Sequence, residues 1–169
     1  MAPTRSRDPC SLANTLDFTT LSTALDYDLS FERKTLEGTV THVLECVSDP
    51  KGDAVTGEVW LDSNHVDVKG VSIDSKSIAE GTGPGASWKK EEKIEPYGEK
   101  LVIKLGKKLA KGENVELKIQ FRTTAAGTAI GWMEKEMTPN KKYPYMCLSS
   151  LPPHSRRSRR LMNCLGGGL

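Results

Sequence analysis

The sequence is short of several features on which specialised folds depend. Its 169 residues include only four cysteines (Cys10, Cys46, Cys147 and Cys164), and none belongs to a C-x-x-C pair. Disulfide-stabilised secreted domains carry denser, patterned cysteines, so we expect no disulfide framework and a reduced Cys46 in the core. Aromatic residues make up only 6% of the chain, so aliphatic side chains must fill most of its core.

Targeting and membrane signals are also lacking. No run approaches the roughly 20 apolar residues that a membrane-spanning helix needs. The first eight residues are polar and do not resemble a signal peptide, and no Asn-x-Ser/Thr glycosylation site occurs. The sequence therefore predicts a cytoplasmic protein with no membrane partner.

Charge excludes little, because 24 basic residues nearly balance 22 acidic ones and leave a net charge of +2. The excess lies in the run Ser155-Arg-Arg-Ser-Arg-Arg160. Such a run could bind nucleic-acid phosphates. Since no aromatic residues interleave with it for base stacking, we expect a non-specific charged tail and no specific nucleic-acid partner.

Alternating apolar residues dominate the body of the chain and predict strands with one buried face. The clearest case is Val115, Leu117, Ile119 and Phe121, which alternate with polar side chains. After Gly70 the apolar positions change phase, which predicts a β-bulge there. Further strands are predicted around Leu25–Phe31, Val40–Cys46, Val55–Leu61, Val66–Ile73 and Leu101–Leu105.

Turn signals separate these strands. Ser48–Asp53, Glu80–Gly85 and Gly106–Gly112 are rich in glycine, proline or aspartate, as turns and surface loops require. No helical period and no internal repeat is evident. We therefore predict an all-β fold, either an antiparallel sandwich or a saddle-like curved sheet.

The pattern fails from Cys147 onward. The prolines at 152 and 153 cannot continue an interior strand, and the segment ends in Gly-Gly-Gly-Leu169. We predict a β domain over residues 1–146, incomplete at its C-terminal end, and a disordered Pro/Arg/Gly-rich tail over 147–169.

No residue pattern indicates a catalytic, cofactor-binding or metal site. In a strand, His42 and Glu45 would point to opposite faces, so His42 is predicted to be structural. His65, in a turn between Asp62 and Asp67, has too few potential ligands around it. Gly81-Thr-Gly-Pro-Gly85 lacks the lysine and the following helix of a phosphate-binding loop. Trp60, Trp88 and Trp132 are predicted to be packing residues.

Several short motifs, in order along residues 8–146, resemble the N-terminal β domain of leukotriene A-4 hydrolase-like zinc aminopeptidases, which belong to the aminopeptidase N superfamily. The motifs are Asp8-Pro-Cys-Ser-Leu-Ala13, Tyr27-Asp-Leu-Ser-Phe31, Thr35-Leu-Glu-Gly-Thr39, Val59-Trp-Leu-Asp62, Val66-Asp-Val-Lys-Gly-Val71, Ala129-Ile-Gly-Trp132 and Lys142-Tyr-Pro-Tyr-Met146.

The resemblance also implies that the chain lacks the family's substrate-binding and zinc-binding motifs. After the last motif the family has substrate-binding glutamines, where this sequence has Ser149 and Leu151. His154 falls where the family has a histidine, but it carries no role over. The family's Gly-x-Met-Glu-Asn and His-Glu-x-x-His motifs are missing, and the latter would supply the zinc ligands and the general base. Tyr97 is therefore expected to be a turn residue and not the family's catalytic tyrosine.

The resemblance thus implies a non-catalytic domain that frames the peptide-substrate cleft of a full-length aminopeptidase. Its partner would be the catalytic domain, with Trp132 at the interface. Zinc and peptide substrate would be bound only by the whole enzyme, and this chain alone is predicted to be inactive. The alternative is a non-enzymatic β-sandwich interaction module or a short regulatory isoform.

The change in sequence character after Met146 has two explanations. One is a shifted reading frame, a retained intron or a mis-predicted splice junction. The other is a genuine short isoform. A chain ending here would leave a sheet edge unpaired and apolar surface exposed.

Overall fold

The structure is a computed structural model, and it describes residues 9–48, 56–127, 129–139 and 141–148. In these residues it contains strands and one short 3₁₀ helix, and no helix that is long and apolar enough to span a membrane. The elements, in chain order, are β1 (Phe18–Ser30), β2 (Thr35–Cys46), β3 (Glu58–Ser63), β4 (Val66–Ile73), β5 (Lys76–Glu80), β6 (Ala86–Lys90), β7 (Glu99–Leu105), β8 (Asn114–Thr123), β9 (Ile130–Met133), η1 (Lys135–Met137) and β10 (Tyr145–Leu148).

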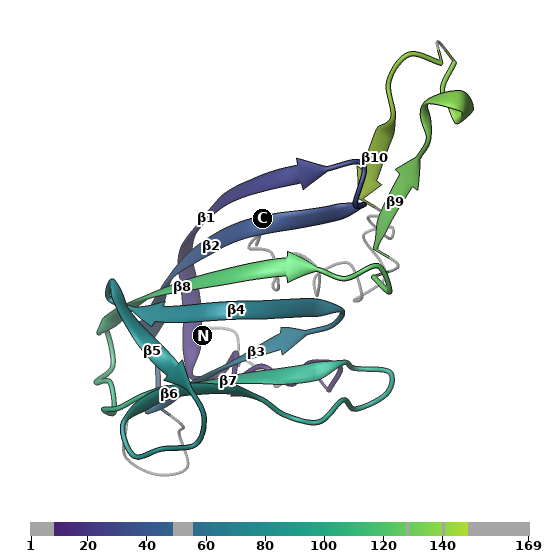
Figure 1. Cartoon of the computed structure of the whole chain (residues 1–169). Helices are drawn as coiled ribbons and strands as arrows, with labels where there is room; N and C mark the ends of the chain where they lie inside the picture. Colours follow the sequence, from purple (N-terminus) through teal and green to yellow (C-terminus); the bar gives the residue numbers. More distant parts are fainter. Residues whose placement is uncertain (1–8, 49–55, 128, 140, 149–169) are drawn as a thin grey trace, which may run out of the picture.

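Most strands belong to one eight-stranded sheet with the order β1-β2-β8-β4-β5-β6-β7-β3. Neighbouring strands are antiparallel except β5 and β6, which pair in parallel over a short stretch. Figure 1 shows the long strands β1, β2, β8 and β4 on one side and β6, β7 and β3 on the other, with β5 at the corner between them. The prediction of an all-β fold with a curved sheet is confirmed.

The core lies inside this curved sheet and is built from the predicted alternation. On β8, Val115, Leu117, Ile119 and Phe121 are all buried, while the residues between them face outward. Matching apolar residues come from β2, β3 and β7, and Trp88 on β6 closes the cluster. Cys46 is buried in the same core, as expected.

The strand pairing confirms the predicted irregularity at Gly70. Between Val68 and Gly70 the register of β4 against β8 shifts, because an extra residue is accommodated at that point. After the shift the odd-numbered residues of β4 face the core on the new alternation, and Val71 packs there.

Some elements and boundaries were not predicted. β5, β6, β9 and β10 had no clear alternation, and β3 begins at Glu58, while Val55 and most of the 48–53 turn lie outside the described residues. β10 extends through Leu148, two residues past the predicted domain end at Met146. The remainder of the predicted tail, residues 149–169, lies outside the described residues.

The segment before β1 covers the outer edge of β3. The Asn14 side chain imitates a strand, because its Nδ2 donates to Glu58 O (2.9 Å) and its Oδ1 accepts from Trp60 N (2.8 Å). Near the C-terminal end of β3, the Asp62 carboxylate accepts hydrogen bonds from Ser11 Oγ (2.6 Å) and Leu12 N (2.7 Å). This edge of the sheet is therefore not available for pairing.

Candidate functional site

His42 lies in the core and is structural, as the strand period predicted. Its side chain is only 4% exposed, on the face of β2 that also carries Val40 and Leu44, while Glu45 faces the other way. Its Nδ1 lies 3.0 Å from Thr23 Oγ1, and its Nε2 has no hydrogen-bond partner among the described residues. Burial lowers the pKa of His42 to about 4, so the ring is neutral at physiological pH.

The three residues around the β3–β4 turn do not form a site together. The His65 backbone, at φ 57°, accepts hydrogen bonds through its carbonyl from Thr124 N (3.0 Å) and Thr124 Oγ1 (3.1 Å). Asp62 is buried under the segment before β1, and Asp67 lies 3.8 Å from Lys69 Nζ. Asp62 is therefore a structural anchor, a role that sequence reasoning missed because its partners lie about 50 residues away.

The zinc chemistry of leukotriene A-4 hydrolase-like enzymes finds no ligand set here. Within residues 9–48, 56–127, 129–139 and 141–148, no three His, Cys, Asp or Glu side chains are grouped closely enough to hold a metal ion. His42 is enclosed by the core, and His65 sits in the β3–β4 turn. The residues that the structure describes do not fit a zinc centre, and no catalytic step follows from them.

Tyr97 lies in a tight turn, as predicted. Its backbone N–H donates to Ile94 O (2.6 Å), and Gly98 N donates to the same carbonyl (2.9 Å). Gly98 has a φ of 90°, and a Cβ there would meet the backbone of Ser63, so only glycine fits.

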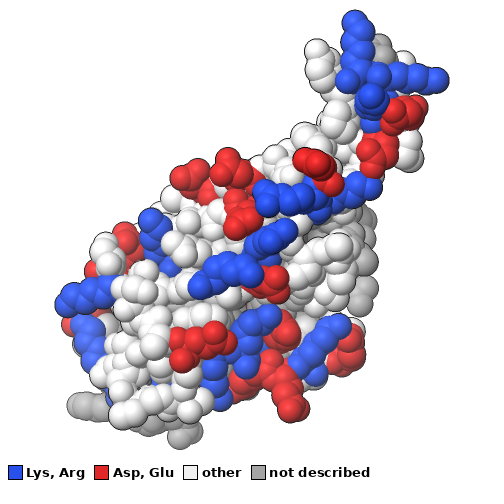
Figure 2. Space-filling model, viewed as in Figure 1, with Lys and Arg blue, Asp and Glu red and all other residues white. Residues whose placement is uncertain are grey.

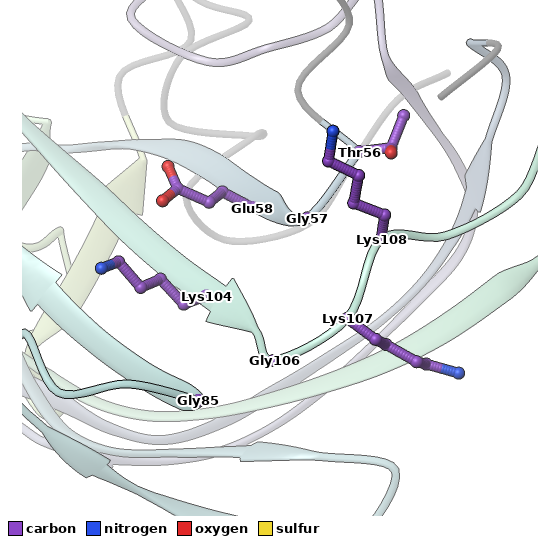
Figure 3. Close-up of a pocket in the computed structure, with 8 residues that line it drawn as sticks. All are labelled: Thr56, Gly57, Glu58, Gly85, Lys104, Gly106, Lys107 and Lys108. Carbon is purple, nitrogen blue, oxygen red and sulfur yellow. The ribbon is translucent and has the colours of Figure 1, made fainter. Parts of the chain in front are cut away.

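An open pocket of about 540 Å³ lies beside the β7–β8 connection. Figure 3 shows lysines at 104, 107 and 108 around it, with Lys107 pointing away from the other side chains. Thr56 Oγ1 has no hydrogen-bond partner among the described residues, but Thr56 is fully buried, so it offers little to a ligand in the hollow. The lining contains Glu58 but no serine, cysteine or histidine, so it does not form the nucleophile–base pair of a Ser/His or Cys/His site.

A more distinctive feature is the hairpin arm formed by β9 and β10, which projects from the curved sheet (Figure 1). Its antiparallel register pairs Met133 with Tyr145 and Trp132 with Met146. A Cβ at position 131 would lie 2.6 Å from Cys147 Sγ, so a larger residue there would require the Cys147 side chain to move.

Two contacts fix the arm to the β1–β2 turn. The rings of Phe31 and Trp132 meet edge to face with centroids 5.8 Å apart, a favoured aromatic geometry. Alongside them, Lys34 Nζ lies 2.6 Å from Glu134 Oε1. Since that ion pair is exposed, we attribute most of the anchoring to the aromatic contact.

The end of the arm presents apolar surface to solvent. A hollow of about 280 Å³ is lined by Met133, Thr138, Pro139, Tyr143, Pro144 and Tyr145. Met137, Tyr143 and Tyr145 are 64%, 77% and 59% exposed. Figure 2 shows basic side chains gathered around the same tip. Large exposed apolar side chains grouped in this way are typical of a protein-interaction surface.

Comparison with known proteins decides the family. The model of the Peptidase M1 N-terminal domain matches residues 19–165, which is most of the chain. The chain belongs to this family. The match includes the β1–β8 sheet and the β9–β10 arm, and it continues beyond Met146, the end of the segment in which the sequence motifs were found.

Relatives of this Peptidase M1 N-terminal domain are much longer proteins. The chain is 39% identical over 150 residues to a leucine aminopeptidase 2 of Phaeosphaeria nodorum, and 35% identical over the same length to a leukotriene A-4 hydrolase homolog of Botryotinia fuckeliana. Each match covers 89% of this chain but only 22% of the relative.

Solved structures agree with the sequence matches. Native leukotriene A4 hydrolase from Saccharomyces cerevisiae superposes with a TM-score of 0.70 at 34% identity, over 85% of this chain and 21% of that one. The yeast enzyme in complex with bestatin gives a TM-score of 0.68 at 32% identity, over 86% and 21% of the two chains. The chain thus corresponds to the non-catalytic N-terminal domain of this enzyme family.

Proposed function

We propose that this Peptidase M1 N-terminal domain frames the peptide-substrate cleft of a zinc aminopeptidase of the leukotriene A-4 hydrolase kind. The observation that carries the proposal is the family match over residues 19–165, together with relatives that are aminopeptidases. The chemistry would belong to a catalytic domain, which would hold the zinc and the peptide. The unrelated interaction module is not favoured, because the matches are to the N-terminal regions of such enzymes.

The arm is the part of the domain that we propose meets the catalytic domain. It combines a fixed base, through Phe31 and Trp132, with an exposed apolar tip. A stable domain interface needs a rigid support and an apolar surface that loses its water when the partner binds. A cytoplasmic location is part of the same proposal, and fractionation of cells producing the native protein tests it.

A chimera tests this function directly. The matching segment of the Phaeosphaeria nodorum leucine aminopeptidase 2 would be replaced by this chain's segment, and release of leucine from a chromogenic substrate measured. We expect a zinc-loaded enzyme with clear aminopeptidase activity. Within that chimera, Trp132→Ala should lower kcat/KM by about tenfold, because it removes the ring contact with Phe31 that fixes the arm and so loosens the support of the apolar tip.

Trp60→Ala is the matched control, since Trp60 is another half-buried tryptophan but lies on β3, where it stacks under Lys100. It should leave kcat/KM within about twofold of the parent chimera. A folded, zinc-loaded chimera without activity would overturn the proposal, as would equal effects of the two tryptophan substitutions.

A further inference from the structure

The β9–β10 arm forms a two-stranded sheet of its own, and in the described part of the chain neither strand pairs with the eight-stranded sheet. Backbone pairing therefore does not set the angle at which the arm leaves the body (Figure 1). Side-chain contacts between arm and body are then what restrains that angle. Two such contacts come from the turn between β1 and β2, residues 31–34.

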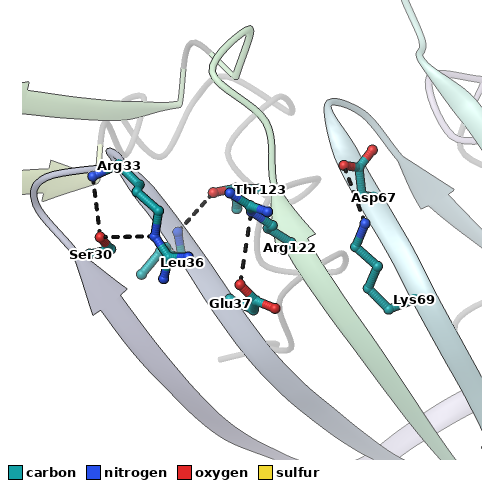
Figure 4. A network of polar contacts seen from close by, with 8 residues as sticks. All are labelled: Ser30, Arg33, Leu36, Glu37, Asp67, Lys69, Arg122 and Thr123. Atoms are coloured by element: carbon teal, nitrogen blue, oxygen red, sulfur yellow. Dashed lines mark hydrogen bonds and ion pairs between the residues drawn. The ribbon is translucent and has the colours of Figure 1, made fainter.

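The chain that leaves β8 towards the arm is held at two points. Thr123, the last residue of β8, accepts a hydrogen bond at its Oγ1 from Leu36 N (2.9 Å), as Figure 4 shows. The next residue, Thr124, donates from its N (3.0 Å) and its Oγ1 (3.1 Å) to His65 O. The base of the arm is thus fixed to β2 on one side and to the β3–β4 turn on the other. A further contact, away from this base, is needed to stop the arm from rotating about it.

The β1–β2 turn provides that contact. Phe31 meets Trp132 on β9 with the two rings nearly perpendicular, at 86°, a geometry that restrains direction as well as distance. Lys34 pairs with Glu134, just beyond the end of β9. Since both side chains of this ion pair are about half exposed, water and salt weaken it. The ring contact is therefore the one that restrains the arm.

The turn is itself held in one shape. Ser30 Oγ accepts hydrogen bonds from Arg33 N (3.2 Å) and Arg33 Nε (3.4 Å), both drawn in Figure 4. Lys34 then adopts a left-handed φ of 53°. Leu36, two residues later, is the donor to Thr123 at the base of the arm. One short segment of the chain thus contacts both the base and the side of the arm, so a displacement of this segment moves the arm relative to the sheet.

We propose that Phe31 is a positioning residue, which sets the orientation of the arm through Trp132 and thereby the catalytic efficiency of the assembled enzyme. The inference rests on the proposed function, in which the arm meets the catalytic domain. Phe31 lies in the β1–β2 turn and acts only through Trp132. A small displacement of the parts that frame a reaction is enough to slow it strongly.

The orientation of the arm can be measured in the chain alone, from the residual dipolar couplings of its backbone amides. In the parent chain one alignment should account for the amides of β8 and of the β9–β10 arm. Phe31→Leu should abolish this agreement for the arm and leave β8 unchanged. Phe31→Tyr should retain it, because Phe31 is 36% exposed and the added hydroxyl can reach water. Tyr27→Leu is the matched control, since Tyr27 is an aromatic residue of β1 that stands opposite Gly38 on β2.

The consequence for catalysis is measured in the aminopeptidase chimera. Phe31→Leu should lower kcat/KM by about tenfold. Phe31→Tyr, Tyr27→Leu and Lys34→Asn should each stay within about twofold of the parent chimera, the last because asparagine tolerates the φ at that position. Phe31→Leu should have little further effect once Trp132→Leu is present, because both substitutions remove the same contact.

An arm that keeps its alignment in the Phe31→Leu chain would overturn the proposal. Effects of Phe31→Leu and Trp132→Leu on kcat/KM that simply multiply would also overturn it, because independent effects exclude action through their shared contact. An inactive parent chimera would count against the proposed function instead, and the alignment of the arm would still decide whether Phe31 positions it.

Discussion

At the scale of single residues, His42 is the group whose ionisation bears most directly on the stability of the fold. It is buried beside Thr23 and opposite Leu117, and no described residue offers a hydrogen-bond partner to its Nε2. A charged imidazolium in that position would lose its hydration and gain no counter-charge. Burial accordingly lowers the pKa of His42 from 6.5 to about 4.

The sign of the pH dependence follows from this pKa. The unfolded chain takes up a proton at His42 near pH 6.5, and the folded chain only near pH 4. The contribution of neutral His42 to the free energy of unfolding is therefore complete above pH 6.5 and lost as the pH falls towards 4. The two pKa values correspond to about 3 kcal/mol. Urea unfolding across this pH range should show the loss.

Carboxylates also contribute to the pH dependence of the free energy of unfolding, and a comparison of variants separates their contribution from that of His42. His42→Leu should flatten the decline between pH 6.5 and 4, whatever it does to stability at neutral pH. His65→Asn is the matched control, because asparagine tolerates the positive φ at that turn. It should retain the decline in full. An unchanged pH dependence in the His42 variant would show that His42 is not the responsible group.

At the scale of elements, the pairing of β1 with β2 depends on one close approach. A Cβ at Gly38 would clash with the Asp26 carbonyl oxygen and would lie 2.5 Å from Tyr27 Cα. Tyr27 stands directly opposite Gly38 in the register. The long edge strand can therefore lie against β2 at this point only because position 38 has no side chain.

Gly38→Ala should push β1 away from β2 around Tyr27. We expect a loss of about 1–3 kcal/mol in the free energy of unfolding, as for other overpacked sites. Hydrogen exchange at the β1 amides from Ala24 to Ser30 should accelerate more than exchange in β8. Gly57→Ala is the control, because its Cβ would meet only ordinary contacts near 3.5 Å. Equal destabilisation by the two changes would refute the role of Gly38.

How far the elements could be predicted from sequence depended on whether a strand buries one face. β8 was predicted over Val115–Phe121, because each of its core residues there alternates with a polar one. The bulge at Gly70 was predicted because it changes that phase. β5 could not be predicted, since it is short and largely exposed and places only Ile78 against the core, and its parallel pairing with β6 depends on the sheet turning a corner.

Contacts between distant segments left even less trace in the sequence. The Asn14 and Asp62 contacts that cover β3 join residues separated by 44 to 51 positions, and no local period marks them. β1 shows a different limit of prediction from sequence. Its alternation predicted a strand correctly, but Leu25, Tyr27 and Leu29 are exposed, because nothing in the described chain lies over them. An alternating pattern indicates which face is apolar, and only the tertiary arrangement determines what covers it.

At the scale of the whole molecule, two parts of the described structure contrast. The interior of the curved sheet holds the domain together, and the arm presents an exposed apolar tip. Neither of them brings together a base, a nucleophile and a metal-ligand set. This division is consistent with a domain that positions other chains while the chemistry takes place elsewhere.

The whole chain should therefore release no amino acid from leucyl substrates, even with zinc added. It has only three histidines, none in a His-Glu-x-x-His pattern that would place two ligands on one helix face. Elemental analysis after gel filtration should find no stoichiometric zinc, and a full-length aminopeptidase relative would serve as the positive control. Turnover that co-elutes with the chain and is abolished by a chelator would contradict this expectation, because it would require a metal centre formed by residues that the sequence does not mark.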